Sequence, residues 1–173
     1  PQEFAHSIYQ PEEWQAITSF THHPYGEEFE METPDNMMHD RFLNVPLDSM
    51  MTYIVRSLRQ GIPVCWEGDI SEKGFDMESG IATLDNENAN NNDATTNAAA
   101  LRQKAFELRS TTDDHCMALV GLAHDKQGKR YIIAKNSWGA IGRYHGYIFM
   151  SEQYIKMKTI AVMVKKKTVI TNL

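Results

Sequence analysis

Two short segments of the sequence combine residue types that could perform acid–base catalysis. The first, residues 113–116 with the sequence DDHC, stands where a polar loop turns into the apolar run of residues 117–121. A histidine at the entrance of a strand, here His115, can be held rigidly while its ring faces a cleft, as a general base requires. Taken alone, the segment is more simply explained by a histidine that only caps the strand.

The second segment, residues 135–139 with the sequence KNSWG, follows the next expected strand. In an antiparallel pair joined by the turn at Gly128, the end of one strand lies beside the start of the other, which would bring Asn136 close to His115. An amide there can fix the tautomer and orientation of the imidazole, and the indole of Trp138 can shield that hydrogen bond from water. The alternative is a tight turn with a buried tryptophan. Together, the two segments favour a catalytic pair.

The elements that would position this pair are strands in quick succession. Strands are expected over residues 115–124, 130–136, 144–150 and 160–166, and a further one over 62–67. Their short connections predict an antiparallel sheet, curled toward a barrel. With the helices described next, the fold class is α+β, in one domain over residues 1–173.

Two helices are expected beside the sheet. Apolar residues recur at three- and four-residue spacing over residues 46–60, with Asp48 as a plausible N-cap and Gly61 at the C-terminal end. A second helix is expected over residues 98–109, after an Asn-rich loop at 86–97. Residues 1–45 are turn-rich, with a short helical start at Pro11.

Length and composition describe an ordinary globular domain. The 173 residues are 42% hydrophobic and 23% charged, which excludes a collagen, a disulfide-rich miniature and a disordered chain. No apolar stretch approaches the roughly 20 residues that cross a bilayer, and residues 1–10 do not resemble a secretory signal. We expect no membrane association. Because the chain begins with Pro1 rather than Met, we expect a processed product or a fragment, and its compartment stays open.

Charge is distributed unevenly along the chain. Residues 1–95 hold 18 acidic and 4 basic residues, whereas the remainder holds 5 acidic and 13 basic ones. The basic run at Lys165, Lys166 and Lys167 could attract nucleic acid. Because no aromatic residues interleave with that run, solvated or mutually complementary charged faces are the favoured interpretation.

The remaining candidates for chemistry are thiols and imidazoles. Cys65 and Cys116 allow one disulfide or two free thiols, and the sequence does not choose between them. His22, His23 and His39 could be metal ligands, but loop histidines without Cys partners or an HExxH helix are more often surface residues. We therefore predict no metal site.

At these motifs the chain resembles the papain-like cysteine peptidases, whose C-terminal half carries a catalytic His at a strand start and a catalytic Asn in an N-S-W-G motif. Asp114-His115 and the strand ending in Gly121 match that half in order and spacing, as do the segments YIIAKNSWG at 131–139 and GYI at 146–148. Residues 61–70, GIPVCWEGDI, and 146–154, GYIFMSEQY, resemble most the bleomycin hydrolase and aminopeptidase C branch. The likeness runs from about residue 3 to residue 166.

The resemblance implies a mechanism without a cofactor. A cysteine thiolate attacks the peptide carbonyl, the imidazole of His115 holds the thiolate and then protonates the leaving amine, and Asn136 orients that imidazole. Asp114 and Trp138 would support the site. Glu67 lies near the position that lines the substrate pocket in the family, where a carboxylate favours a basic substrate side chain, and Cys116 is assigned to the same pocket.

The chain departs from the family where the nucleophile is concerned. The resemblance places the nucleophilic cysteine in a mostly helical N-terminal half, and neither Cys65 nor Cys116 has the sequence surroundings of a nucleophile; we expect both to be buried, inert thiols. We therefore expect a partner half, as a separate chain or a cleaved segment, and a chain that is inactive alone. Exo- or endopeptidase specificity, a higher oligomer, a pseudo-peptidase and a peptide- or nucleic-acid-binding domain stay open as alternatives.

Overall fold

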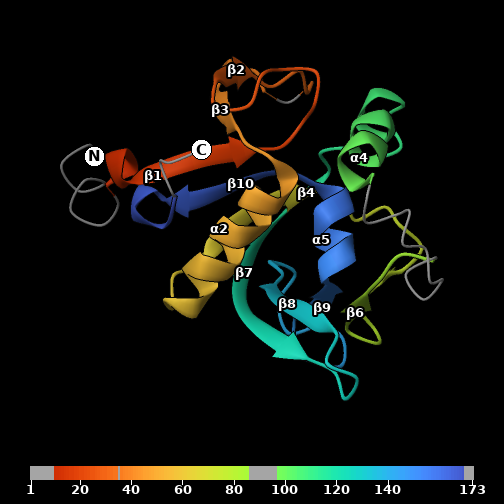
Figure 1. Cartoon of the computed structure of the whole chain (residues 1–173). Helices are drawn as coiled ribbons and strands as arrows, with labels where there is room; N and C mark the ends of the chain where they lie inside the picture. Colours follow the sequence, from red (N-terminus) through yellow and green to blue (C-terminus); the bar gives the residue numbers. More distant parts are fainter. Residues whose placement is uncertain (1–9, 35, 86–96, 170–173) are drawn as a thin grey trace.

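The computed structural model describes residues 10–34, 36–85 and 97–169, and this part of the chain combines one large sheet with three α-helices (Figure 1). The helices are α2 (Leu47–Arg59), α4 (Ala98–Glu107) and α5 (Glu152–Lys158), with short 3-10 turns η1 (Pro11–Glu13) and η2 (Lys166–Thr168). The strands are β1 (Trp14–Thr18), β2 (Glu28–Glu30), β3 (Arg41–Asn44), β4 (Val64–Gly68), β5 (Phe75–Asp76), β6 (Ile81–Ala82), β7 (His115–His124), β8 (Arg130–Lys135), β9 (Tyr147–Ser151) and β10 (Thr159–Lys165).

Within the described residues, ten strands join in the order β2-β3-β1-β10-β4-β7-β8-β9-β6-β5. Neighbouring strands are antiparallel except for two pairs, β1 with β3 and β6 with β9, which are parallel. The sheet twists strongly, so that β1 and β10 run across the view of Figure 1 while β7 runs down it. The expected α+β class is confirmed, and the two parallel pairs are an addition to the expected antiparallel sheet.

The α2 helix forms where the apolar spacing predicts it. Its buried side includes Met50, Ile54 and Leu58, which pack into the main hydrophobic core. Gly61 closes the helix in a left-handed conformation at φ 70°, with its amide on Leu58 O and the amide of Ile62 on Ser57 O, a Schellman motif. The predicted N-cap is wrong: Pro46 occupies that position, and Asp48 lies in the first turn, where its charge still favours the helix dipole.

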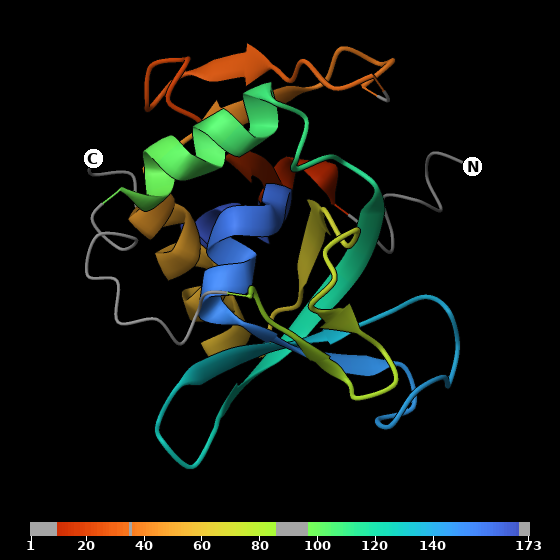
Figure 2. The same cartoon turned by 90° about the vertical axis from the view of Figure 1, so that its right-hand side faces the viewer.

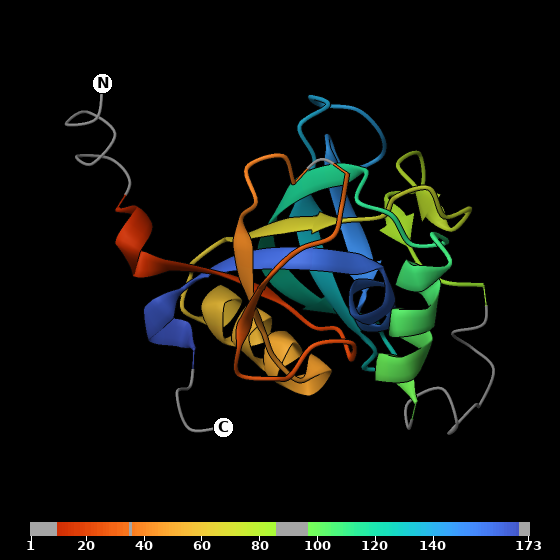
Figure 3. The same cartoon turned by 90° about the horizontal axis from the view of Figure 1, so that it is seen from above.

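The central strands bury one face and leave the other open. Apolar side chains that alternate along β4 and the first half of β7 are buried and belong to the main core, together with the buried residues of α2. These strand residues are Val64, Trp66, Met117 and Leu119. The residues between them are half-buried or exposed. Seen from above, α2 and the connection between β8 and β9 lie on opposite sides of the sheet (Figure 3). The fold therefore has a packed side and an uncovered side.

A buried arginine connects the α4 helix to the residues that follow β1. Arg102 donates to Ser19 O at 2.8 Å and to Lys156 O at 3.3 Å, and its guanidinium lies 4.5 Å from the ring centre of Phe20. Burial lowers the pKa of Arg102 to about 9. In Figure 2, α4 lies next to the segment that carries β2 and β3. A second small core, built on Phe20, Phe29, Met31 and Ile160, fills this junction.

Several elements differ from the expectation. The segment expected to be turn-rich contains β1, β2 and β3, and the helix α5 was not expected at all. The helix expected at 98–109 ends at Glu107, and the strand expected from residue 144 begins at Tyr147. Residues 86–96 of the predicted Asn-rich loop lie outside the described residues. No described helix has the length and apolar character needed to span a bilayer.

A buried ion pair connects the end of β4 with α5 and with the segment that precedes β7. Lys158 Nζ lies 3.4 Å from Asp69 Oδ2 and also donates to Ser110 O at 3.1 Å and to Thr111 Oγ1 at 3.0 Å. It pairs in addition with the carboxylate of Glu72. Asp69 accepts the backbone amide of Thr112 at 3.2 Å. The path of residues 110–112 is therefore fixed by charge-assisted contacts.

Replacement of Lys158 by Met should destabilise the chain by about 3–5 kcal/mol, because it leaves the buried Asp69 carboxylate without its partner. The measurement is the free energy of unfolding from urea denaturation. Lys156→Met is the matched control, since that lysine pairs with Glu152 at the surface of the same helix and should cost no more than about 1 kcal/mol. Equal losses in the two variants would contradict the role given to the buried pair.

Candidate active site

The structure brings the two predicted segments together. His115 Nε2 lies 2.9 Å from Asn136 Oδ1. Because a carbonyl oxygen only accepts, Nε2 must carry the ring proton, and in the neutral imidazole the lone pair is then on Nδ1. Asn136 Nδ2 faces the sulfur of Met77 at 3.7 Å, which agrees with this orientation of the amide. Nδ1 makes no hydrogen bond to any residue in the described part of the chain, so it is available to a reacting group.

The hairpin of β7 and β8 sets this geometry. Asp125 Oδ1 accepts the amides of Gln127 and Lys129, and Gly128 takes φ 83°, which closes the turn between the strands. Ala118 then lies opposite Lys135, so that residue 136 continues beside the start of β7. The amide of Asn136 donates to Gly146 O at 2.9 Å, and its side chain is only 2% exposed. The asparagine is therefore held rigidly beside the histidine.

Trp138 covers part of the His115 ring, as the sequence suggests. The two ring centres are 4.9 Å apart at an angle of 43°. The indole itself is 48% exposed. The alternative interpretation, a tight turn with a buried tryptophan, is wrong about the burial of Trp138. One side of the His115 ring is therefore covered by an indole that is itself partly open to solvent.

Asp114 positions the start of β7 rather than contacting the imidazole by a hydrogen bond. Its Oδ1 accepts the amide of Ile70 at 2.9 Å and its Oδ2 accepts the hydroxyl of Thr112 at 3.4 Å. Burial raises the pKa of this carboxyl above its usual value, and the nearby charge of Asp69 adds to the effect, although both hydrogen bonds oppose it. The residue ties the entrance of β7 to the loop after β4.

The two cysteines are not the buried, inert thiols that the sequence suggests. Cys116 is exposed and Cys65 is half-buried, and both are free. Their sulfurs lie 3.4 Å apart on adjacent antiparallel strands, in the register that pairs Cys65 with Ala118 and Glu67 with Cys116. By strand alternation Cys116 points to the opposite face from His115. Neither thiol is therefore placed to act with that imidazole.

The thiols perturb each other electrostatically. A hydrogen bond from Cys116 lowers the pKa of Cys65 to about 7, although burial and the Glu67 carboxylate oppose the shift. The same hydrogen bond, together with burial, raises the pKa of Cys116 above its usual range. Cys65, Glu67 and Cys116 line one small cavity of about 150 Å³, on the uncovered face of the sheet. The predicted pocket residues Glu67 and Cys116 are therefore neighbours.

Some residues that shape the site carry no sequence signal. Asp69 and Lys158 fix the segment before His115, and Met77 contacts Asn136 from a distant part of the chain. A buried Asp–Lys pair 89 residues apart follows no local pattern. The motif around Asn136 could be found because it is contiguous.

The three loop histidines and the basic run make their ion pairs with glutamates outside the His115–Asn136 pair. His39 pairs with Glu30 in an exposed turn, whereas His22 and His23 both contact Glu32. Lys165, from the basic run, lies 3.1 Å from the Glu13 carboxylate.

Comparison with known proteins identifies the family. Residues 4–173 match the Peptidase C1-like family, and the chain therefore belongs to it. It is 29% identical over 161 residues to aminopeptidase G, and 30% identical over 130 residues to aminopeptidase W, both from Lactobacillus delbrueckii subsp. lactis. These alignments cover 90% and 74% of the chain. The resemblance to papain-like peptidases of the aminopeptidase C branch is confirmed.

A solved structure shares the fold. The crystal structure of PepW from Lactobacillus rhamnosis superposes with a TM-score of 0.74 over 98% of the chain and 39% of its own, at 19% sequence identity. The chain spans 36% and 29% of the lengths of aminopeptidases G and W.

The coupled thiols predict a characteristic pH profile of alkylation. In the native chain, iodoacetamide should label Cys65 with a midpoint near pH 7, because the Cys116 thiol stabilises the thiolate. Cys116→Ala removes the donor and should move the midpoint upward, to about 8.5 or above. Peptide mapping by mass spectrometry after timed labelling gives the rate at each cysteine. An unchanged midpoint in Cys116→Ala would refute the hydrogen-bonded pair.

Proposed function

We propose that this chain forms the His/Asn part of a papain-like cysteine peptidase, with the nucleophilic cysteine supplied by a part of the protein outside these 173 residues. The observation that carries the proposal is the contact of His115 Nε2 with Asn136 Oδ1 at 2.9 Å, which leaves Nδ1 directed to a reacting group. Membership of the Peptidase C1-like family supports it. His115 acts as the acid and the base. Asn136 does not contact the reacting atoms, and acts by orienting the His115 ring.

The chemistry follows from this arrangement. A thiolate beside Nδ1 of the His115 imidazolium attacks the peptide carbonyl carbon, and the carbon–nitrogen bond breaks as Nδ1–H protonates the leaving amine. Nδ1 then takes a proton from the water that attacks the thioester, which releases the acid and restores the thiolate. Asn136 keeps the ring in one orientation through both proton transfers. No cofactor enters these steps.

Two observations support a nucleophile from outside the chain. Both cysteines of the sequence lie together on the face that the alternation of β7 separates from His115. An exposed apolar side chain, Trp138, also lies beside the His115 ring. A second half that brings a thiolate to Nδ1 would cover this side chain.

The names of the relatives favour an exopeptidase. Aminopeptidases G and W are similar over most of this chain, and we extend the removal of N-terminal residues from peptides to the complete protein on that basis.

Labelling with a thiol-directed epoxide inhibitor tests the division of the site. In the native preparation, the label should map by peptide mass spectrometry to a cysteine outside these 173 residues. His115→Ala should slow that labelling by about 10²–10⁴-fold, because the thiolate loses its imidazolium partner. The matched control is His124→Ala, an exposed histidine at the far end of the same strand.

The result that would overturn the proposal is a label found only on Cys65 or Cys116, or labelling that does not change in His115→Ala. A native preparation in which no cysteine reacts faster than Cys65 would favour the pseudo-peptidase.

Glu67 gives a prediction about specificity. If its carboxylate faces the substrate side chain, Glu67→Gln should lower kcat/KM about tenfold for lysyl peptides, through loss of one charge-assisted contact. The kcat/KM for leucyl peptides should stay the same, and this neutral substrate serves as the internal control. Parallel losses for both substrates would show that Glu67 acts on the site as a whole rather than on the substrate side chain.

A further inference from the structure

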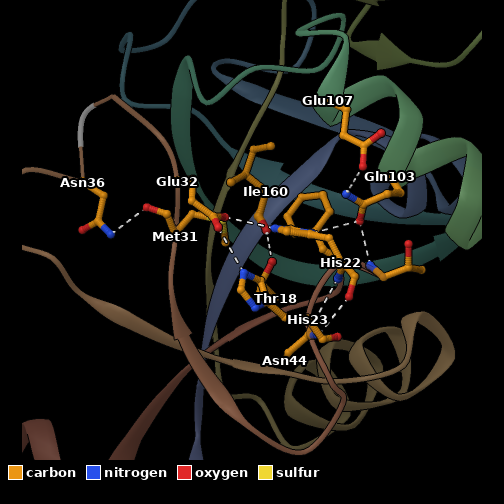
Figure 4. Close-up of polar contacts among 12 residues, drawn as sticks. Thr18, His22, His23, Met31, Glu32, Asn36, Asn44, Gln103, Glu107 and Ile160 are labelled. Atoms are coloured by element: carbon orange, nitrogen blue, oxygen red, sulfur yellow. Dashed lines mark hydrogen bonds and ion pairs between the residues drawn. The ribbon is translucent and has the colours of Figure 1, made fainter.

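The loop after β1 gathers three side chains that suit a metal ion. His22 Nε2 lies 3.0 Å from Glu32 Oε2, and His23 Nε2 lies 3.0 Å from Glu32 Oε1 (Figure 4). All three ligand atoms fall within 4.8 Å of one another. The two 3.0 Å contacts fit pairs of ligands that each lie about 2.0–2.2 Å from one ion.

Each ring nitrogen of His22 lies within hydrogen-bond distance of an oxygen atom. Its Nδ1 lies 3.2 Å from Gln103 Oε1, an oxygen that also accepts the amide of Thr21 at 2.7 Å. The Gln103 amide nitrogen donates to Glu107 at 2.9 Å, which fixes Oε1 as the group facing His22. Both nitrogens of one imidazole therefore face acceptors. A neutral ring has only one proton, so one of its two nitrogens then faces an acceptor with its lone pair.

Either a second proton or a metal ion on Nε2 resolves this conflict. The hydrogen bond from Nδ1–H to a carbonyl oxygen is the usual outer contact of a metal-bound histidine, which it orients and makes more basic.

The ligands are held in place before any ion binds. The ring of His23 stacks on Phe29 at 4.0 Å, and the ring of His22 meets Phe29 edge-on at 5.5 Å. The buried side chain of Asn44 donates to Phe20 O and His23 O, both at 2.8 Å, which fixes the loop backbone. His22 and Glu32 are exposed and His23 is half-buried, so these contacts rather than burial hold the ligands in place.

We propose that His22, His23 and Glu32 form a binding site for Zn²⁺, with Gln103 as the residue that orients His22. Two imidazoles and a carboxylate are a ligand set that zinc accepts, whereas Mg²⁺ and Ca²⁺ prefer oxygen ligands. A fourth position is left for water. The surrounding half of the chain is acidic, which attracts a cation. The ion fastens the loop after β1 to the segment after β2.

The test uses tag-free protein that has been stripped with EDTA. Zn²⁺ binding is measured by competition with a chromophoric chelator, and metal content by elemental analysis. We expect one Zn²⁺ per chain and a rise in the unfolding midpoint of about 5–10 °C at a hundredfold excess over Kd. Glu32→Gln and His23→Gln should each weaken binding by more than a hundredfold. Gln103→Ala should weaken it by about 10–100-fold, as loss of an outer contact does.

Two variants serve as matched controls. Glu30→Gln removes the carboxylate of the neighbouring exposed pair with His39, and Cys65→Ser/Cys116→Ser removes the thiols, which could also bind zinc. Both should keep the affinity of the native chain. Zn²⁺ binding that survives in Glu32→Gln and His23→Gln, that disappears in the thiol variant, or that is absent from the native chain would overturn the proposal.

Discussion

The buried contact between Asp69 and Lys158 is the constraint on which the rest of the structure depends. It joins three segments that are far apart in the sequence: the end of β4, the approach to β7 and the end of α5. Burial of two charges is favourable only when further hydrogen bonds satisfy them, and here Ser110, Thr111 and Thr112 do so. The first residue after this network that carries chemistry is His115. The segment that leads into His115 is therefore positioned by a network that the imidazole does not join.

The two faces of the sheet have different roles. The buried face holds the rigid elements, because the buried residues of α2, β4, β7 and β8 interlock there in one core. The uncovered face holds the close thiols and Glu67. A carboxylate near a thiolate opposes its ionisation, so the lowered pKa of Cys65 depends on the single hydrogen bond from Cys116. The ionisation of Cys65 on this face would therefore change if that one contact were lost.

The sequence predicted those features of the structure that depend on residues close together in the chain. The α2 helix, the β7–β8 hairpin and the proximity of His115 to Asn136 follow from periodicity, a turn and a contiguous motif, all within short stretches. The strands β1 to β3 were missed because β1 is stabilised by pairing with β10, which is about 150 residues away. The exposure of Cys116 was missed because free cysteines are usually buried, whereas this one lies on the open face of β7. The contact of Glu32 with His22 and His23 requires the loop to fold back, and no spacing rule encodes that return.

The zinc ligands and the candidate active site are linked through one helix, and the links differ in strength. Gln103 of α4 contacts His22, and a cleft of about 760 Å³ runs from Glu32 past Phe106 to Asp113. Ordering of the loop after β1 would therefore restrict α4. The connection from α4 to β7, however, passes through Ser110 and Thr111, which Lys158 already holds. Because that segment is fixed independently, an ion at His22 and His23 would stabilise the fold around α4 without redirecting His115.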